Sequence, residues 1–393
     1  MARKIETILA QAGRAPVRQY GPVNPPVKRG STILHTSIGA KREIAQRAAL
    51  EPVENYGTMG NETHFALEAA LAEIEGGTHA QVTSSGLSAV TVPLLAYLKA
   101  GDHLLVPDSV YGPTRSFCDS VLRRFNIETS YYDPMIRPEA LASLFRANTR
   151  VLFTESPGSH TFEVQDIPAL AAVAHKLGAK VFLDNSWGIL NFSPFAHGVD
   201  VSIHALTKYV GGHSDIILGA VIVNSEEDWR WLRHGSLELG NYASPDDCWL
   251  ALRGLRTLHV RLKSAEAAAL RIANWFSQQP EVARVLHPAF QSCPGHEFFK
   301  RDFTGACGLF GVVFKPEFSA EDVDRMIDAL QMFGIGASWG GFESLVLPTT
   351  GTIRRSAGTG VFEGPAARFQ IGLENNDELI ADLQQALRAL KAG

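Results

Sequence analysis

The 393-residue sequence lacks the features that mark several common classes of protein. Its four cysteines, Cys118, Cys248, Cys293 and Cys307, lie too far apart for the paired spacing of a zinc site or a redox motif, so we expect reduced thiols and no metal centre. A net charge of -5 leaves no broad basic face, which argues against a nucleic-acid partner. No apolar run has the length of a signal peptide or a membrane span, so we expect a cytoplasmic protein without a membrane partner.

Cofactor motifs of other enzyme classes are absent or incomplete. The segment 334–340 (GIGASWG) has the wrong final spacing for a dinucleotide fingerprint, and no phosphate-binding loop of the GxxxxGK[ST] type occurs. His296 and Glu297 begin like a zinc-protease helix, but the second histidine is missing. Nicotinamide, ATP and zinc chemistry are therefore poorly supported.

The chain is long enough, and at 45% hydrophobic residues apolar enough, for a large core and more than one domain. Residues 1–60 have weak periodicity and a proline-rich start, which predicts an N-terminal arm that lies on another part of the assembly. A helix then begins at Asn61 and Glu62, and Gly76 and Gly77 end it.

Strands and helices alternate beyond this helix. We expect strands at 79–84, 103–107, 127–132, 151–155, 180–184, 199–205 and 216–223, with helices at about 87–99, 113–125, 138–146 and 166–177. This alternation predicts an α/β fold with a large, mostly parallel sheet covered on both faces. The character changes near residue 255, so we expect a large domain over 61–255 and a smaller α+β domain over 256–393, with helices at about 257–278 and at Asp377 to Lys391.

Lys208 points most strongly to a function. It closes the segment 199–208, which predicts a buried strand running into a turn, and an amine in such a turn can bond to an aldehyde. The apolar strand 180–184 ends at Asp184, at the sheet edge where ligands collect in α/β proteins. Pyridoxal 5'-phosphate (PLP) needs both groups, because its aldehyde bonds a lysine and a carboxylate keeps its pyridine nitrogen protonated. A lone strand lysine is more often a solvated edge residue, so the interpretation depends on the pair.

Three further features fit the same cofactor and its substrate, although each has an ordinary structural explanation. The segment 84–88 (SSGLS) lies between a strand and an apolar helix, where backbone N–H groups can hold a phosphate, and Thr207 can offer a hydroxyl. Tyr111 follows another strand end, where its ring could stack on the pyridine or simply pack in the core. Arg368 lies on a strand pattern in the second domain, and its planar guanidinium matches the carboxylate of an amino acid or a surface ion-pair partner.

Several further motifs occur in order along most of the chain after the arm: 63–65 (THF), 73–77 (EIEGG), 155–159 (ESPGS), 184–187 (DNSW), 205–209 (ALTKY), 212–215 (GHSD), 253–258 (RGLRTL) and 338–344 (SWGGFES). Together they resemble the Cys/Met-metabolism family of PLP-dependent enzymes, and most closely its cystathionine β-lyase branch. The branch assignment depends on Ser159 and Ala205, where many γ-acting relatives carry asparagine and serine.

The resemblance implies a PLP-dependent fold type I (aspartate aminotransferase-like) and assigns roles to residues. Lys208 would bond the cofactor aldehyde, and Arg368 with Ser338 would hold the substrate carboxylate, with Ser159 and Trp339 as further substrate-binding candidates. Tyr56 would reach the neighbouring subunit's site, in a homo-oligomer that is typically a tetramer built as a dimer of dimers. Cofactor-binding candidates are Lys208, Asp184, Gly86, Leu87, Tyr111, Thr207 and Tyr56, and the catalytic candidates are Lys208, Tyr111 and Tyr56.

One position departs from the family pattern. Relatives carry Tyr-x-Arg, whose arginine binds the cofactor phosphate across the subunit interface, whereas this chain has Tyr56, Gly57 and Thr58. A charge-assisted hydrogen bond contributes roughly 1.5–3 kcal/mol, so cofactor affinity falls unless another group compensates. A neutral bond from Thr58 and a loop reshaped for another substrate both remain open.

The resemblance gives one leading function and two alternatives. The leading one is a PLP-dependent carbon–sulfur lyase that carries out β-elimination on cystathionine or a related small amino acid and yields a thiol, pyruvate and ammonia. The runner-up is a γ-lyase acting on canavanine, methionine or an O-substituted homoserine, which the altered 57–62 loop motivates. A regulatory protein that holds the cofactor without turnover is the third, and the survival of Lys208, Asp184 and Arg368 argues against it.

Overall fold

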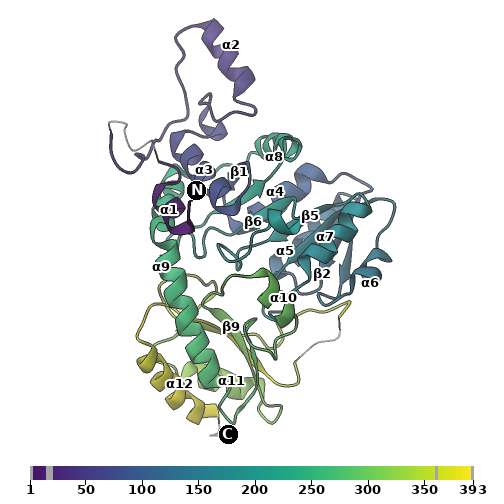
Figure 1. Cartoon of the computed structure of the whole chain (residues 1–393), viewed down its shortest axis with the longest axis vertical. Coiled ribbons are helices and arrows are strands. Elements are labelled where there is room, and N and C mark those ends of the chain that lie inside the picture. The colour runs from purple at the N-terminus through teal and green to yellow at the C-terminus, as the bar shows by residue number, and fades with distance from the viewer. Residues whose placement is uncertain (1–2, 15–20, 359–361, 391–393) are drawn as a thin grey trace.

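A computed structural model describes residues 3–14, 21–358 and 362–390. Figure 1 shows a large sheet with its helices in one half of the body and a second sheet with its own helices in the other half. The long helix α9 (Pro245–Phe276) runs along both halves. The expected α/β architecture with a smaller C-terminal α+β region is therefore what the chain adopts.

The large sheet has seven strands in the order β1-β7-β6-β5-β4-β2-β3. Pairs among β2 to β6 are parallel, and β7 pairs antiparallel with both β1 and β6, so the prediction of a mostly parallel sheet is confirmed. The strands are β1 (His79–Thr83), β2 (His103–Pro107), β3 (Glu128–Tyr132), β4 (Thr149–Glu155), β5 (Lys180–Asp184), β6 (Val201–His204) and β7 (Gly219–Val223).

Alternate residues of these strands enter two different apolar clusters. Phe182 packs with the helices α4 and α8, whereas its neighbours Val181 and Leu183 pack with α6 and α7. Side chains of a strand alternate between its two faces, so helices on both sides of the sheet explain the continuously apolar strands. The helices around the sheet are α3 (Glu62–Glu75), α4 (Gly86–Tyr97), α5 (Gly112–Phe117), the π-helical turn η2 (Cys118–Leu122), α6 (Pro138–Ala142), α7 (Ile167–Lys176), the 3-10 turn η3 (Phe195–His197) and α8 (Glu226–Glu238).

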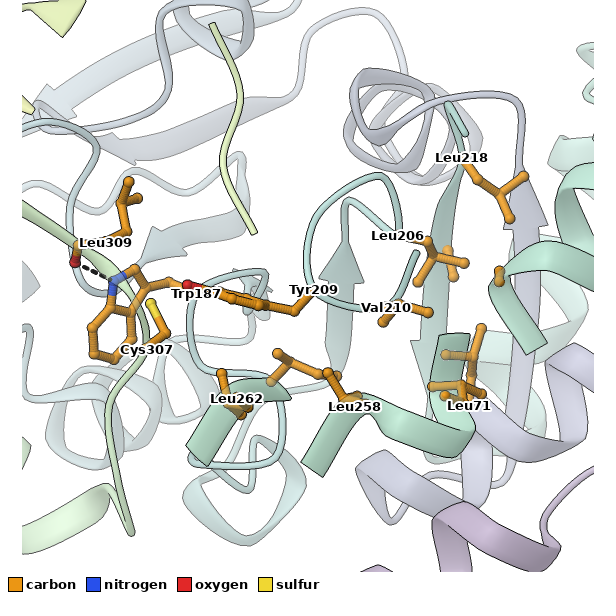
Figure 2. Packing of buried hydrophobic residues seen from close by; sticks show 14 of the residues in the cluster. Leu71, Trp187, Leu206, Tyr209, Val210, Leu218, Leu258, Leu262, Cys307 and Leu309 are labelled. Atoms are coloured by element: carbon orange, nitrogen blue, oxygen red, sulfur yellow. Dashed lines mark hydrogen bonds between the residues drawn. The ribbon is translucent and has the colours of Figure 1, made fainter. Parts of the chain in front are cut away.

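The long helix α9 begins twelve residues earlier than the sequence suggests, at Pro245 instead of about 257. Ser244 caps it by accepting a hydrogen bond from the amide of Asp246, and the change of character near residue 255 falls inside the helix. Figure 2 shows Tyr209 and Val210, from the segment after β6, facing Leu258 and Leu262 of α9. This shared core fixes the segment that carries Lys208 against the helix that links the two halves.

The second sheet has five strands in the order β10-β11-β12-β9-β8. Its core joins β9, β12 and the last turns of α9 to the helices α11 and α12. The sequence predicted α12, and its predicted end at Lys391 lies outside the described residues. The elements are β8 (Val282–Leu286), α10 (His296–Asp302), β9 (Leu309–Phe314), α11 (Ala320–Asp328), β10 (Gly334–Ile335), β11 (Leu345–Pro348), β12 (Ala366–Gln370) and α12 (Asn376–Leu390).

The N-terminal arm has two different parts. Helix α1 (Ile5–Gln11) packs on the body, where Arg256 of α9 donates to the carbonyl of Leu9 at 2.7 Å. Helix α2 (Ile38–Arg47) buries none of its residues and stands away from the body in Figure 1. The short turn η1 (Gly57–Met59) leads back to α3. Within the described ranges, no helix is both long and apolar enough to cross a membrane.

Candidate active site

Lys208 lies in a tight turn that follows β6. The amide of Lys208 donates to the carbonyl of Ala205 at 3.1 Å, and the Lys208 carbonyl accepts from the amide of Gly212 at 2.8 Å. A side chain at Gly340 would lie 2.9 Å from the Lys208 carbonyl carbon, and Gly340 has a φ of 83°. Glycine is therefore required there for the second half of the molecule to approach the lysine backbone.

The amine of Lys208 is held between the two halves. It donates to the hydroxyl of Ser338 at 2.8 Å and lies 5.5 Å from the ring centroid of Trp339. Burial, reinforced by the nearby charge of Arg368, lowers the pKa of this amine to about 8. The amine can therefore lose and regain a proton near neutral pH, as a nucleophile or base in a catalytic site must.

Asp184 ends β5 beside the Lys208 turn. Its carboxylate accepts from the amide of Ser186 at 3.0 Å, and the Ser186 hydroxyl accepts from the amide of Ala205 at 2.8 Å, so one serine links the two strand ends. Burial raises the pKa of Asp184, although the bonds from Ser186 oppose the shift. A carboxylate in this position can keep a pyridine nitrogen protonated.

A buried polar cluster next to Asp184 joins helix α3 to the strand ends. The Glu75 carboxylate accepts from Ser202 at 2.8 Å and from the amide group of Asn185 at 3.2 Å, and it pairs with His204 at 3.0 Å. Burial raises the pKa of Asp184, and the electrostatic contribution of His204 opposes that rise. The polar cluster therefore favours the ionised form of the Asp184 carboxylate.

Arg368 reaches the same space from β12. Its guanidinium donates to the backbone carbonyl of Ser338 at 3.1 Å and pairs with no described carboxylate. Burial lowers the pKa of Arg368. An enclosed arginine without an anionic partner is costly to bury, so a carboxylate ligand is the group that would complete its pairing.

The start of helix α4 forms the candidate phosphate site. Ser85 caps the helix through the amide of Ser88 at 3.0 Å, and the amides of Gly86 and Leu87 donate to no described residue. A side chain at Gly86 would lie 2.6 Å from the Cβ of Ala205, so glycine keeps this helix end against the lysine turn. Free first-turn amides attract phosphate.

Thr207 has a different environment from the one the sequence suggests. Its hydroxyl donates to the carbonyl of Leu218 at 3.2 Å and accepts from the Leu218 amide at 3.0 Å. A phosphate contact from Thr207 would have to share or replace these bonds, and this role stays a prediction.

Tyr111 stands at the other side of the site. Its amide donates to the Glu155 carboxylate at 2.8 Å, and the residue is 44% exposed. Burial, followed by the adjacent Asp184, raises the pKa of Glu155 well above its usual range. Sequence reasoning assigned no role to Glu155, although it ends β4 directly beside Asp184. The shared strand-end position was the signal that could have identified it.

A cavity of about 640 Å³ opens beside Tyr111. Ser159, His160, Leu87 and Arg354 line it together with Tyr111. Burial and the charge of Arg368 lower the pKa of His160 to about 4, so its ring is neutral at pH 7, and its Nδ1 atom is buried without a partner. The volume of the cavity falls within the usual range for a small-molecule site. Sequence reasoning missed His160 and Arg354 because only the fold brings them to Tyr111.

The single chain does not bring Tyr56 to this site. Tyr56 is 50% exposed and lies with Thr58 in a separate hollow that Arg29 and Tyr242 also line. The arm therefore displays Tyr56 away from Lys208 of its own chain. All other candidate site residues from the sequence lie around the Lys208 turn, the start of α4 or the cavity at Tyr111.

These residues fit PLP. Lys208 offers an amine with a lowered pKa, Asp184 offers a carboxylate on the neighbouring strand, and the first amides of α4 are free for a phosphate. Together the three groups match the aldehyde, the pyridine nitrogen and the phosphate of this cofactor.

Comparisons with known proteins agree with this fit. The family model described as "Cys/Met metabolism PLP-dependent enzyme" matches residues 6–388. A protein of Rhizobium johnstonii named "Putative cystathionine beta-lyase" is 46% identical over 392 residues, covering 99% of this chain and 97% of the relative. "Cystathionine beta-lyase" of Haemophilus influenzae is 41% identical over 388 residues and 97% of each chain. The crystal structure of MetB from Corynebacterium glutamicum superposes with a TM-score of 0.90 at 30% identity, over 99% of this chain and 98% of that one.

More distant similarity extends to other activities. An L-alanine/L-glutamate racemase of Wolbachia pipientis is 38% identical, and cystathionine gamma-lyase of Dictyostelium discoideum is 33% identical. Overall sequence similarity alone therefore does not separate the reactions of this group.

Proposed function

The chain belongs to the Cys/Met metabolism family of PLP-dependent enzymes, and from this premise we propose that it is a carbon–sulfur lyase that carries out β-elimination on cystathionine or a related amino acid. In the reaction the Cβ–S bond of cystathionine breaks, and water and the substrate together yield homocysteine, pyruvate and ammonia. The names of the relatives at 41% and 46% identity support the β-specificity.

One observation carries this proposal: the amine of Lys208 lies between Asp184 on the large sheet and Arg368 on the second sheet, with Ser338 holding it. The bound cofactor supplies an aldehyde for this amine and a ring that accepts electrons from the substrate. The proposed role of Lys208 is to remove the α-proton of the substrate and to donate a proton to the departing sulfur, so that homocysteine leaves as a thiol; an amine with a pKa of about 8 can do both.

The other residues orient the groups that react. Asp184 would keep the pyridine nitrogen of the bound cofactor protonated, and Tyr111 would pack against its ring. Arg368 binds the substrate carboxylate and so fixes the direction of the bond that breaks, which is a positioning contribution. Gly86 and Leu87 would hold the phosphate through the free amides at the start of α4.

A product assay tests the proposal. We expect cystathionine to give pyruvate and homocysteine in equal amounts, and Lys208→Ala to abolish both. Release of 2-oxobutyrate and cysteine in place of pyruvate would contradict β-elimination. It would favour the γ-lyase alternative, in which canavanine, methionine or an O-substituted homoserine is the substrate, and for which the absence of a cation at Thr58 is the motivating feature.

We also propose that the active unit is a cytoplasmic homo-oligomer, a tetramer formed from two dimers. The arm supports it, because α2 buries no residue of its own chain, Leu34 is 91% exposed, and Tyr56 lies away from Lys208. Mixing the variants Lys208→Ala and Tyr56→Ala, each of which we expect to be inactive alone, tests it. If Tyr56 acts in the neighbouring site, re-formed mixed dimers contain one intact site and regain activity, whereas no recovery would contradict the exchange of arms.

A further inference from the structure

A cation without a partner lies at the edge of the candidate active site. Arg354 lines the same cavity of about 640 Å³ as Tyr111 and Ser159. Its side chain is exposed, and throughout the described part of the chain it has no hydrogen-bond, ion-pair or ring partner. The other arginine of the cavity, Arg115, is engaged by an ion pair with Asp108 and by the ring of Tyr131, whose centroid lies 3.7 Å away.

The backbone on the C-terminal side of Arg354 is fixed by two carboxylates of the large domain. Glu163 forms a buried ion pair with Arg355, the residue directly after Arg354. Asp108 accepts hydrogen bonds from the three consecutive amides of residues 356–358, at distances of 2.6 to 3.1 Å. The segment is therefore anchored across the two halves of the molecule, and Arg354 alone is left free at the cavity.

Among the charged groups that line the cavity, Arg354 alone has a charge that no described partner offsets. Asp108 is neutralised by Arg115 and by the three amides, so its negative charge does not offset Arg354. His160 is neutral at pH 7 and can contribute only a hydrogen bond. A planar guanidinium that lacks a partner is a natural ligand for a carboxylate.

We propose that Arg354 binds a second carboxylate at the distal end of the substrate, so that the enzyme prefers amino acids whose leaving group is anionic. Arg368 would hold the α-carboxylate at the cofactor end, and Arg354 would hold the carboxylate of the departing thiol in the cavity beside Tyr111. This inference rests on the proposed lyase function and deepens it, because it assigns Arg354 as the residue that selects the part of the substrate that leaves with the sulfur.

A matched pair of substrates tests the proposal. S-carboxyethyl-L-cysteine and S-propyl-L-cysteine have similar lengths, but only the first carries the distal charge. We expect Arg354→Gln to raise the KM for the carboxyethyl compound on the order of tenfold to a hundredfold, which is the range for a lost charge-assisted bond, with kcat nearly unchanged. Arg354→Gln should convert the propyl compound with the same KM and kcat as the wild type. Arg354→Lys should have a lower KM for the carboxyethyl compound than Arg354→Gln, because it keeps the positive charge.

A surface variant controls for the loss of one positive charge. Arg137 is exposed, does not line the cavity, and pairs with no described residue, so Arg137→Gln should leave both substrates unaffected. Equal losses on both substrates with Arg354→Gln, or no loss on either, would overturn the proposal.

The test separates this inference from the function on which it rests. If the wild type releases no pyruvate from any cysteine conjugate, the lyase proposal fails, and absorbance titration of the bound cofactor with the same two compounds then decides about Arg354. Weaker binding of the carboxyethyl compound alone to Arg354→Gln would retain the anion subsite, and equal binding would reject it.

Discussion

The amine of Lys208 donates a hydrogen bond to the hydroxyl of Ser338 at 2.8 Å, and the backbone carbonyl of the same serine accepts from Arg368 at 3.1 Å. Ser338 thereby connects the turn after β6 with the strand β12. It has a φ of 90°, which non-glycine residues rarely adopt and which persists only where the surroundings enforce it. The serine therefore positions the lysine relative to the arginine.

Replacing this serine separates two roles. With Ser338→Ala we expect kcat to fall roughly tenfold or more, because a hydrogen bond to a charged amine contributes about 1.5–3 kcal/mol. Steady-state kinetics with cystathionine measure the effect. A rise in KM at constant kcat would show instead that Ser338 acts on the substrate carboxylate, as the family resemblance implies.

The lowered pKa of Lys208 predicts the pH dependence of cofactor capture. Only the unprotonated amine attacks an aldehyde, so the rate at which the apoenzyme binds PLP should rise with pH and level off above about 8. Stopped-flow absorbance measures this rate. A rate that continues to rise toward the ordinary lysine pKa, about 10.4, would contradict the desolvated environment.

Replacing Arg368 by lysine should impair catalysis. A lysine keeps the charge but loses the planar pair of donors that matches a carboxylate, so Arg368→Lys should lower kcat/KM about a hundredfold. The absorbance of the bound cofactor should persist, because Arg368 lies on the substrate side of Lys208. Loss of cofactor binding in this variant would place the arginine in a different role.

Asp108 should stabilise the fold in a pH-dependent way. Burial opposes ionisation, but the amides of Ala357, Ser356 and Gly358 outweigh it and lower the pKa of Asp108. A carboxyl group whose pKa is lower in the folded state stabilises above its unfolded pKa, near 3.9, and loses this contribution as the pH falls through the folded value.

Removing the charge tests this contribution. Asp108→Asn leaves Arg115 without its ion-pair partner, so the free energy of unfolding at pH 7 should fall by about 3–5 kcal/mol. Urea denaturation measures it at pH 7 and at pH 3, and the difference between wild type and variant should shrink at the lower pH. An equal difference at both pH values would contradict the assignment.

The sequence predicted the parts of the site that depend on local pattern. The apolar strands that end at Asp184 and lead to Lys208 form as expected, and the strand pattern around Arg368 is β12. These predictions succeed because the ends of parallel strands meet at one edge, so order along the chain determines proximity.

The rest depends on contacts between distant segments. Glu163 and Arg355 pair across 192 positions, and Asp108 binds amides about 250 positions away, so no local pattern reveals them. Helix α9 starts at Pro245, earlier than predicted, and proline fits this first turn because its missing N–H is not needed there.

The central claim is that the amine of Lys208 carries the cofactor. Reduction of the purified enzyme with sodium borohydride converts a lysine–aldehyde bond to a stable secondary amine, which peptide mass spectrometry locates. We predict the pyridoxyl mass on the peptide that contains Lys208 and no label in Lys208→Ala. Label on a different lysine, or none in the wild type, would contradict the account.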